Sequence, residues 1–158
     1  MSYTVDDYFS WVEEVPSCEL IHGGIYDMSP APTIQHQQTV LRIAGQIDTY
    51  LFNKTCKVLI APADVVLDRK TVVQPDVFIV CDPSKLDGKR CNGAPDFVVE
   101  VLSPSTMKKD LRDKFRLYRR TGVRELWFAY PNEGVIAKYM LHNKRYIEKG
   151  FFTSNDKI

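Results

Sequence analysis

The sequence lacks an excess of charge of either sign. Its 158 residues include 21 Lys and Arg against 20 Asp and Glu, which gives a formal net charge of +1. A protein that bound nucleic acid by charge alone would carry a clear basic excess, so any such function requires a local patch. Disorder of the whole chain is excluded as well, because 44% of the residues are hydrophobic and the charge is balanced.

Long apolar runs are also missing. No stretch reaches the ~18 residues that a membrane-spanning helix requires. The opening residues, MSYTVDDYFSWVEE, carry acids where a secretory signal carries a basic flank. These absences predict a cytoplasmic protein with no membrane association. The length predicts a single domain over residues 1–158, because a chain of this size buries roughly two thirds of its unfolded surface.

Cysteine is sparse, and its four positions show no metal-binding spacing. Cys18, Cys56, Cys81 and Cys91 include no C-x-x-C pair and no companion histidines at a zinc-type spacing. We therefore expect reduced cysteines that serve mostly as packing residues, and neither a disulfide framework nor a zinc site. The chain also has no Ser-His-Asp order, no P-loop and no G-x-G-x-x-G, which argues against classical hydrolases and nucleotide-cofactor enzymes.

Hydrophobic periodicity predicts three helices and several short strands. Apolar residues recur at helical spacing in three segments, and runs of branched residues typical of strands lie between them. The expected helices are 4–16, 33–52 and 107–121. The expected strands are a hairpin at 19–26 and runs at 58–61, 65–67, 77–81, 97–102, 126–130 and 135–141, with a loop at 82–93 and a polar tail at the end. This order is typical of an α/β (α+β) domain with a central mixed β-sheet flanked by helices.

Acidic residues interrupt two otherwise apolar strands. Asp76 begins one of them and Glu100 lies within the other, where an ionised carboxylate is costly unless it is paired or binds a metal. Asp96 begins the same strand as Glu100, about 13 Å away, which is too far for the two to share one ion. Asp76 and Glu100, on neighbouring strands, are the better pair, and oxygen ligands suit Mg²⁺ or Mn²⁺ better than zinc. The structural alternative stays open: Asp76 caps a strand end and Glu100 forms an ion pair.

The third helix supplies a candidate cation for these acids. With Leu111 taken as the centre of the buried stripe, at roughly 100° per residue, Lys114 lies roughly 60° away and therefore at the edge of the core. Asp110 precedes Lys114 by four residues, so the two can form an i,i+4 pair that orients the lysine.

Five further residues are ambiguous by themselves. Lys108, Lys109 and Arg112 belong to a basic run along the third helix, which is usually a solvated face but can also contact phosphates. His36 lies on the apolar side of its helix, where a lone histidine is more often a boundary residue than a ligand. Glu19, within the hairpin, gives no signal of its own.

Taken together, the residues form a pattern that covers nearly the whole chain. The pattern comprises ELIHG at 19–23, MSP at 28–30, His36, PDV at 75–77, PDFVVEVLSPST at 95–106, Asp110, Lys114, Tyr118, GV at 122–123, ELW at 125–127 and Pro131. In this combination the chain resembles the Uma family of restriction endonucleases, from about Thr4 to Leu141.

The resemblance implies a restriction-endonuclease-like fold of the PD-(D/E)XK superfamily and a Mg²⁺-dependent endonuclease that hydrolyses DNA phosphodiester bonds. Asp76 and Glu100 would be the metal-binding acids. The usual motif has a lysine two residues after the second acid, where this chain has Leu102, so Lys114 would fill that role from the helix. Glu19 and His36 match family positions near the site.

Leu102 also motivates an interpretation from a different class of protein. A catalytically inactive nucleic-acid-binding or interaction module could keep the fold without the chemistry. DNA is the expected partner of the endonuclease. A homodimer is expected by analogy alone, because cleavage of a duplex needs two cuts.

Overall fold

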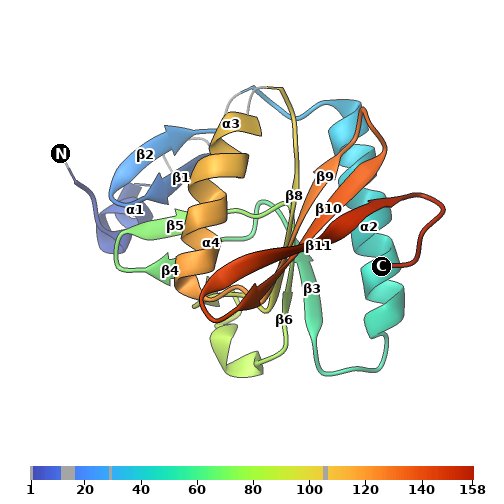
Figure 1. Cartoon of the computed structure of the whole chain (residues 1–158). Coiled ribbons are helices and arrows are strands. Elements are labelled where there is room, and N and C mark those ends of the chain that lie inside the picture. Colours follow the sequence, from blue (N-terminus) through green and yellow to red (C-terminus); the bar gives the residue numbers. More distant parts are fainter. Residues whose placement is uncertain (1, 12–16, 29, 105–106) are drawn as a thin grey trace.

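The computed structural model describes residues 2–11, 17–28, 30–104 and 107–158, and its strands in these ranges form two sheets (Figure 1). The larger sheet has six strands in the order β11-β10-β9-β8-β6-β3. Strands β8 and β9 are parallel, whereas the other neighbours are antiparallel, so the expectation of a central mixed sheet is confirmed. The six strands are β3 Lys57–Ile60, β6 Val77–Val80, β8 Phe97–Val101, β9 Glu125–Tyr130, β10 Val135–His142 and β11 Arg145–Thr153.

The smaller sheet has five strands in the order β2-β1-β5-β4-β7. Its expected hairpin, β1 and β2, turns at His22 and Gly23, whose φ angles are 53° and 80°. The positive φ therefore falls on a histidine as well as on a glycine, as a two-residue hairpin turn requires. The five strands are β1 Cys18–Ile21, β2 Gly24–Asp27, β4 Val65–Asp68, β5 Thr71–Val73 and β7 Cys91–Asn92.

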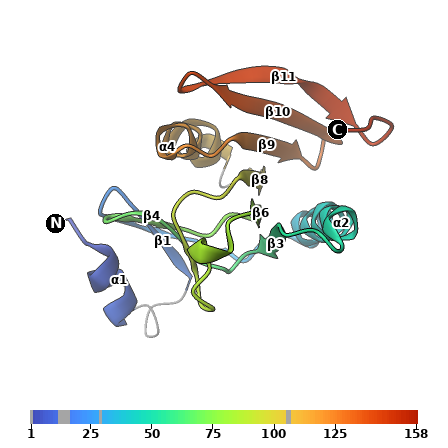
Figure 2. The same cartoon turned by 90° about the horizontal axis from the view of Figure 1, so that it is seen from below.

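Helices cover both faces of the six-stranded sheet (Figure 2). Helix α2 (Ile34–Leu51) packs against one face, where Val40 contacts a dry cluster of β-strand side chains that includes Val99 and Val101. The other face packs against the five-stranded sheet and the segment that ends in α4 (Phe115–Thr121). No helix in the described ranges is both long enough and apolar enough to cross a membrane.

The expected helix at 107–121 is continuous but not α-helical throughout. It consists of α3 (Met107–Lys109), a π-helical turn η2 (Asp110–Lys114) and α4. The π turn is wider than an α-helical turn and changes which side chains face the core. Leu111, the expected centre of the buried stripe, is 36% exposed, whereas Asp110 and Lys114 are each only 4% exposed. Lys114 points away from solvent as expected, but it lies deeper than the edge of the core, because the expectation assumed α-helical spacing centred on Leu111.

Several other boundaries differ from the sequence expectation. The first helix, α1 (Val5–Trp11), begins after a Thr4 cap that bonds reciprocally with Asp7, and the expected continuation over 12–16 lies outside the described residues. Strand β5 was not expected, and the loop at 82–93 contains both the short 3-10 helix η1 (Pro83–Lys85) and β7. The expected polar tail is wrong, because residues 145–153 form β11 at the edge of the larger sheet.

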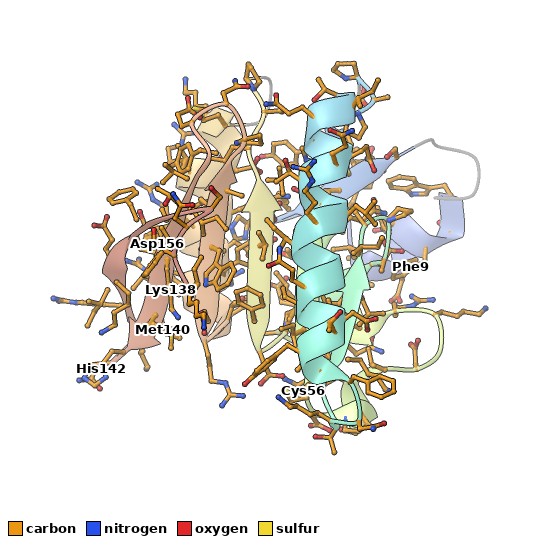
Figure 3. The ribbon with its side chains drawn as sticks, turned by 90° about the vertical axis from the view of Figure 1, so that its right-hand side faces the viewer. Phe9, Cys56, Lys138, Met140, His142 and Asp156 are labelled. Atoms are coloured by element: carbon orange, nitrogen blue, oxygen red, sulfur yellow. A yellow bond between two sulfur atoms is a disulfide. The ribbon has the colours of Figure 1, made fainter. Side chains whose placement is uncertain are left out.

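The cysteines are not all reduced. Cys56 and Cys81 form a disulfide. Cys56 directly precedes β3 (Figure 3), and Cys81 directly follows β6. The expectation failed because it ignored register: Lys57 pairs with Val80 across β3 and β6, so the two cysteines stand opposite each other, with Cα atoms 3.9 Å apart. Cys18 and Cys91 are free and buried, as packing residues should be. The cytoplasmic expectation loses the support that it drew from reduced cysteines.

Candidate active site

The two acids expected to pair lie on neighbouring strands. Val77 of β6 pairs with Val99 of β8 in an antiparallel register, and one further step along that register sets Asp76 opposite Glu100. Opposite residues point to the same face of a sheet. The Oδ2 atom of Asp76 accepts a hydrogen bond of 2.7 Å from the backbone N–H of Val101, which fixes the orientation of this carboxylate.

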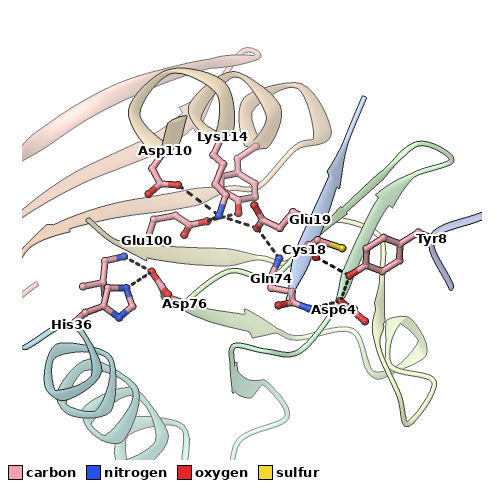
Figure 4. A network of polar contacts seen from close by, with 12 residues as sticks. Tyr8, Cys18, Glu19, His36, Asp64, Gln74, Asp76, Glu100, Asp110 and Lys114 are labelled. Atoms are coloured by element: carbon pink, nitrogen blue, oxygen red, sulfur yellow. Dashed lines mark hydrogen bonds and ion pairs between the residues drawn. The ribbon is translucent and has the colours of Figure 1, made fainter. Parts of the chain in front are cut away.

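Lys114 reaches this face of the sheet from the π turn and contacts three carboxylates (Figure 4). The residue is buried. The distances from its Nζ atom are 3.0 Å to Glu19 Oε1, 3.1 Å to Glu100 Oε1 and 3.6 Å to Asp110 Oδ1. The π turn therefore brings both Asp110 and Lys114 to the acids of the strands. Leu102, at the usual lysine position, is buried in the hydrophobic core.

Burial and charge act in opposite directions within this cluster. Burial raises the pKa of the Glu100 carboxyl above its ordinary value, although the Lys114 ammonium opposes this shift. Burial by itself would lower the pKa of Lys114, but the charges of Glu100 and Glu19 outweigh it and hold that pKa well above its ordinary value. Lys114 is therefore a fixed ammonium at neutral pH, and the cluster depends on its charge.

His36 connects helix α2 to the site. Its Nε2 atom lies 3.3 Å from Asp76 Oδ2. The hydrogen bond with Asp76 raises the pKa of the imidazole, against burial, which lowers it. Its Nδ1 atom is buried and has no hydrogen-bond partner among the described residues. His36 is thus a neighbour of the site, where it can orient the carboxylate of Asp76.

The sequence did not predict a set of hydrogen bonds that fixes Glu19 and the residues next to it. The backbone N–H of Gln74 donates to Glu19 Oε1 at 3.0 Å, and its side-chain amide donates to Asp64 Oδ1 at 2.9 Å. The hydroxyl of Tyr8 donates to the carbonyl of Cys18 at 2.9 Å. These contacts join α1, β1 and the segments beside β4 and β5, which are far apart in the sequence, so no local spacing signals them.

Tyr118 was part of the family pattern but was given no role in the site, yet its hydroxyl donates to Glu100 Oε1 at 2.5 Å. Its place four residues after Lys114 is a signal that could have identified it, because residues at this spacing share a helix face.

The donor set fits a divalent cation held by two carboxylates. Asp76 Oδ2 and Glu100 Oε1 each accept a hydrogen bond, whereas Asp76 Oδ1 and Glu100 Oε2 form no hydrogen bond within the described part of the chain. No group of three or more His, Cys, Asp or Glu residues in that part could hold a metal ion. Mg²⁺ commonly binds through one or two carboxylates and completes its coordination with water and substrate phosphates, so two free carboxylate oxygens suit it.

The expected phosphate-binding residues lie beside this cluster on the same helical segment. Lys108 is exposed, and Arg112 is exposed with its guanidinium 2.9 Å from Asp113. The side chain of Lys109 lies outside the described residues. Lys108 and Arg112 therefore lie on the surface beside the buried carboxylates and are not part of the buried cluster.

A mixed sheet with paired acids on neighbouring strands, and a lysine brought to them from a helix, defines a protein of the restriction-endonuclease-like class. The family model described as "Uma2: Putative restriction endonuclease" matches residues 5–158, and the chain belongs to this family. The assignment confirms the resemblance detected in the sequence.

The chain is also similar to two individual proteins. The chain is 26% identical over 153 residues to "Uncharacterized protein slr1290" of Synechocystis sp. (strain ATCC 27184 / PCC 6803 / Kazusa), a match that covers 96% of this chain and 74% of the relative. Among solved structures, the chain is similar to a "putative nuclease belonging to DUF820" from Anabaena variabilis ATCC 29413, with a TM-score of 0.75 and 16% identity, covering 98% of this chain and 87% of the other. At that identity the similarity shows the fold alone.

Proposed function

We propose that this protein is a Mg²⁺-dependent endonuclease that hydrolyses DNA phosphodiester bonds. The observation that carries the proposal is the contact of the Lys114 ammonium with Glu100, 3.1 Å away, on a strand whose neighbour sets Asp76 opposite. One buried cation and two acids with a free oxygen each are the groups that phosphodiester hydrolysis needs. Membership in a nuclease family supports the same chemistry.

Asp76 and Glu100 would hold the Mg²⁺ or Mn²⁺, which when bound would lower the pKa of a water molecule and neutralise charge that develops on the phosphate. The protein's own residues hold these ligands in position. Val101 and His36 orient Asp76, and Tyr118 orients Glu100. Such fixed contacts reduce the reorganisation that the reaction requires.

Lys114 would act on the phosphate or on the attacking water. Its ammonium is held by Glu19 and Asp110 as well as by Glu100, so it remains charged and stays beside the acids. From there it can stabilise the negative charge of the transition state or orient the nucleophile. Lys114 would in this way do the work of the lysine that Leu102 replaces on the strand.

The basic run that borders the site would bind the DNA backbone. Lys108, Lys109 and Arg112 precede or belong to the turn that carries Lys114, so phosphates bound by them would lie near the acids. Contacts of this kind make affinity fall as salt rises.

A cleavage assay with matched carboxylate variants tests the proposal. Supercoiled and single-stranded DNA would be incubated with Mg²⁺, with Mn²⁺ and with EDTA. We expect cleavage only with the divalent ions, and a loss of roughly 10²–10³ in rate for Asp76→Asn and for Glu100→Gln. Asp96→Asn is the control, because Asp96 directly precedes β8, at the opposite end from Glu100. This variant should cleave at the wild-type rate. Absence of divalent-dependent cleavage across this panel, or unchanged rates in both site variants, would refute the proposal.

A second candidate is a nucleic-acid-binding or interaction module that has lost the chemistry. Leu102 in the core and the contact of Lys114 with three carboxylates favour it. This candidate predicts that neither Mg²⁺ nor Mn²⁺ changes the melting temperature or produces heat in a titration. A clear shift that Asp76→Asn abolishes would count against it.

A further inference from the structure

The exposed face of helix α4 consists of arginine alone. One side of the helix packs against the core, and its exposed residues are Arg116, Arg119 and Arg120. Arg112, in the π turn directly before α4, is exposed as well. Any polar side chain can face water, and cations three or four residues apart on a helix repel each other. A face made only of arginines is therefore better explained by an anionic partner than by solvation.

Positive charge in this neutral chain is concentrated in the helical segment 107–121. The segment holds seven Lys and Arg against two Asp, so the rest of the chain is net acidic although the whole chain has a net charge of +1. A helix dipole favours cations in the last turn, where Arg119 and Arg120 lie. The dipole does not account for Arg112 and Arg116, which lie before that turn. The segment is thus the local basic patch that a neutral protein needs to bind a polyanion.

Two of these four arginines form no ion pair with another described residue. Arg112 and Arg120 are each paired with an aspartate, at 2.9 and 2.6 Å. Arg116 and Arg119 have no such partner in the described part of the chain. They lie three residues apart on α4, so they share one side of the helix. Their planar guanidinium groups are suited to phosphate oxygens, which they can bind in pairs.

We propose that Arg116 and Arg119 bind backbone phosphates of the DNA at a distance from the cleaved bond, and so extend the contacts of Lys108 and Arg112. The inference rests on the proposed nuclease function. Segment 107–121 begins six residues after β8, at the end of the strand that carries Glu100 (Figure 1). DNA that reaches the acids at this end can therefore continue along the exposed side of the segment.

The length of the segment sets the length of DNA that it can contact. Lys108 and Arg119 are separated by eleven residues, which is about 16 Å at 1.5 Å per residue. This distance corresponds to about five base pairs at 3.4 Å each. Arg116 and Arg119 would therefore give the protein a preference for a substrate that extends about five base pairs beyond the phosphates near the acids.

A membrane surface fits this face less well than DNA does. A helix that lies on a membrane inserts an apolar face into the lipid beside its basic face. In α4 the apolar side chains, Leu117 among them, are buried in the core of the protein. An acidic protein segment is the other polyanion that could bind here, and competition with a polypeptide distinguishes it from DNA.

Salt-dependent DNA binding in the absence of metal tests the face separately from cleavage. The fluorescence anisotropy of a labelled duplex would be measured in EDTA over a series of NaCl concentrations. The logarithm of the affinity falls with the logarithm of salt by about 0.9 for each phosphate contact. We therefore expect the slope to fall by about 0.9 in Arg116→Gln and in Arg119→Gln, and by about 1.8 in R116Q/R119Q. The double variant should bind on the order of tenfold to a hundredfold more weakly at about 0.1 M NaCl.

The matched control removes two positive charges from another side of the protein. Arg42 is exposed on α2, across the six-stranded sheet from α4 (Figure 2), and Lys54 is exposed in the turn after α2. R42Q/K54Q should keep the slope and the affinity of the wild type. Circular dichroism should show that both double variants are folded, because each substituted side chain is exposed.

An unchanged slope and affinity in R116Q/R119Q would overturn the proposal, as would a wild type without salt-dependent binding. An equal loss in R42Q/K54Q would also overturn it, since net charge alone would then control binding. If poly-L-glutamate displaced the labelled duplex as well as unlabelled duplex does at equal charge, the partner would be an acidic protein and not DNA. These outcomes concern binding in EDTA, so they leave the nuclease proposal to its own assay. If both proposals hold, R116Q/R119Q should raise the KM of Mg²⁺-dependent cleavage and leave kcat unchanged.

Discussion

The two faces of strand β8 are both buried, but they are packed in opposite ways. Towards α2, Val99 and Val101 join a dry cluster that contains only apolar side chains. Towards the π turn, Glu100 meets the ammonium of Lys114 and the hydroxyl of Tyr118. One strand therefore supports an ordinary core on one side and a buried polar cluster on the other.

The comparison shows which of the two faces is explained by stability. Apolar burial stabilises a fold directly. A buried ion pair seldom contributes more to the free energy of folding than an apolar pair of the same size would. The Lys114 cluster also contains more carboxylates than cations. The dry face is explained by folding alone, and the polar face calls for a functional explanation, which a divalent cation and a phosphate would supply.

The largest effect is expected on the polar face. Lys114→Met keeps the length of the side chain but removes the ammonium that Glu19 and Glu100 share. We expect the free energy of unfolding at pH 7 to fall by about 3–5 kcal/mol, because carboxylates are left buried without their cation. Urea denaturation measures this change. Lys108→Met, on the exposed side of the same segment, should stay within about 0.5 kcal/mol; equal effects in the two variants would contradict the account.

A smaller effect is expected on the dry face. Val99→Ala removes two methyl groups from the cluster beneath α2, so stability should fall by about 1–3 kcal/mol. The site chemistry should be unaffected, because the Val99 side chain points away from Glu100. The comparison of the faces would fail if Val99→Ala lowered the cleavage rate of correctly folded protein as strongly as Glu100→Gln does.

The smallest effect is expected at the start of β8, where Asp96 is half-buried. Burial raises the pKa of this carboxyl, but the N–H of Cys81 and the guanidinium of Arg124 outweigh burial and lower the pKa below its ordinary 3.8. The folded state therefore binds this proton less tightly than the unfolded state. Its stabilisation is present above about pH 4 and is lost as pH falls through the folded pKa.

Asp96→Asn should accordingly cost about 1 kcal/mol at pH 7 and progressively less in acid. Denaturant midpoints measured between pH 7 and pH 2 for wild type and variant would show it. A difference that stays constant over this range would mean that the Asp96 charge contributes nothing.

Much of the fold was predictable because it depends on local pattern. The nearly continuous apolar run of β8 predicts a strand buried on both faces, and the pairing of Asp76 with Glu100 follows from the placement of their segments on neighbouring strands. Strand β11 was missed because Glu148 and Lys149 interrupt its alternation, which resumes at Phe152. Charged side chains are common on edge strands. They break the alternation of apolar and polar residues from which a strand is predicted.

The candidate site was predictable only in part, because its residues come from different elements. The contact of Glu19 with Lys114 joins one sheet to a helix packed on the other, and no spacing in the sequence predicts it. The burial of Lys114 depends on the π turn, which shifts the helix face away from Leu111. The roles of these residues stay predictions until activity is measured.

The most direct test of the central claim compares Lys114→Met with Lys108→Met in Mg²⁺-dependent DNA cleavage at saturating DNA and at a temperature where both variants are folded. The account predicts that Lys114→Met lowers kcat by roughly 10²–10³, whereas Lys108→Met weakens DNA binding and leaves kcat unchanged. A Lys114→Met variant that cleaves with the wild-type kcat would contradict the claim that the buried lysine serves the chemistry.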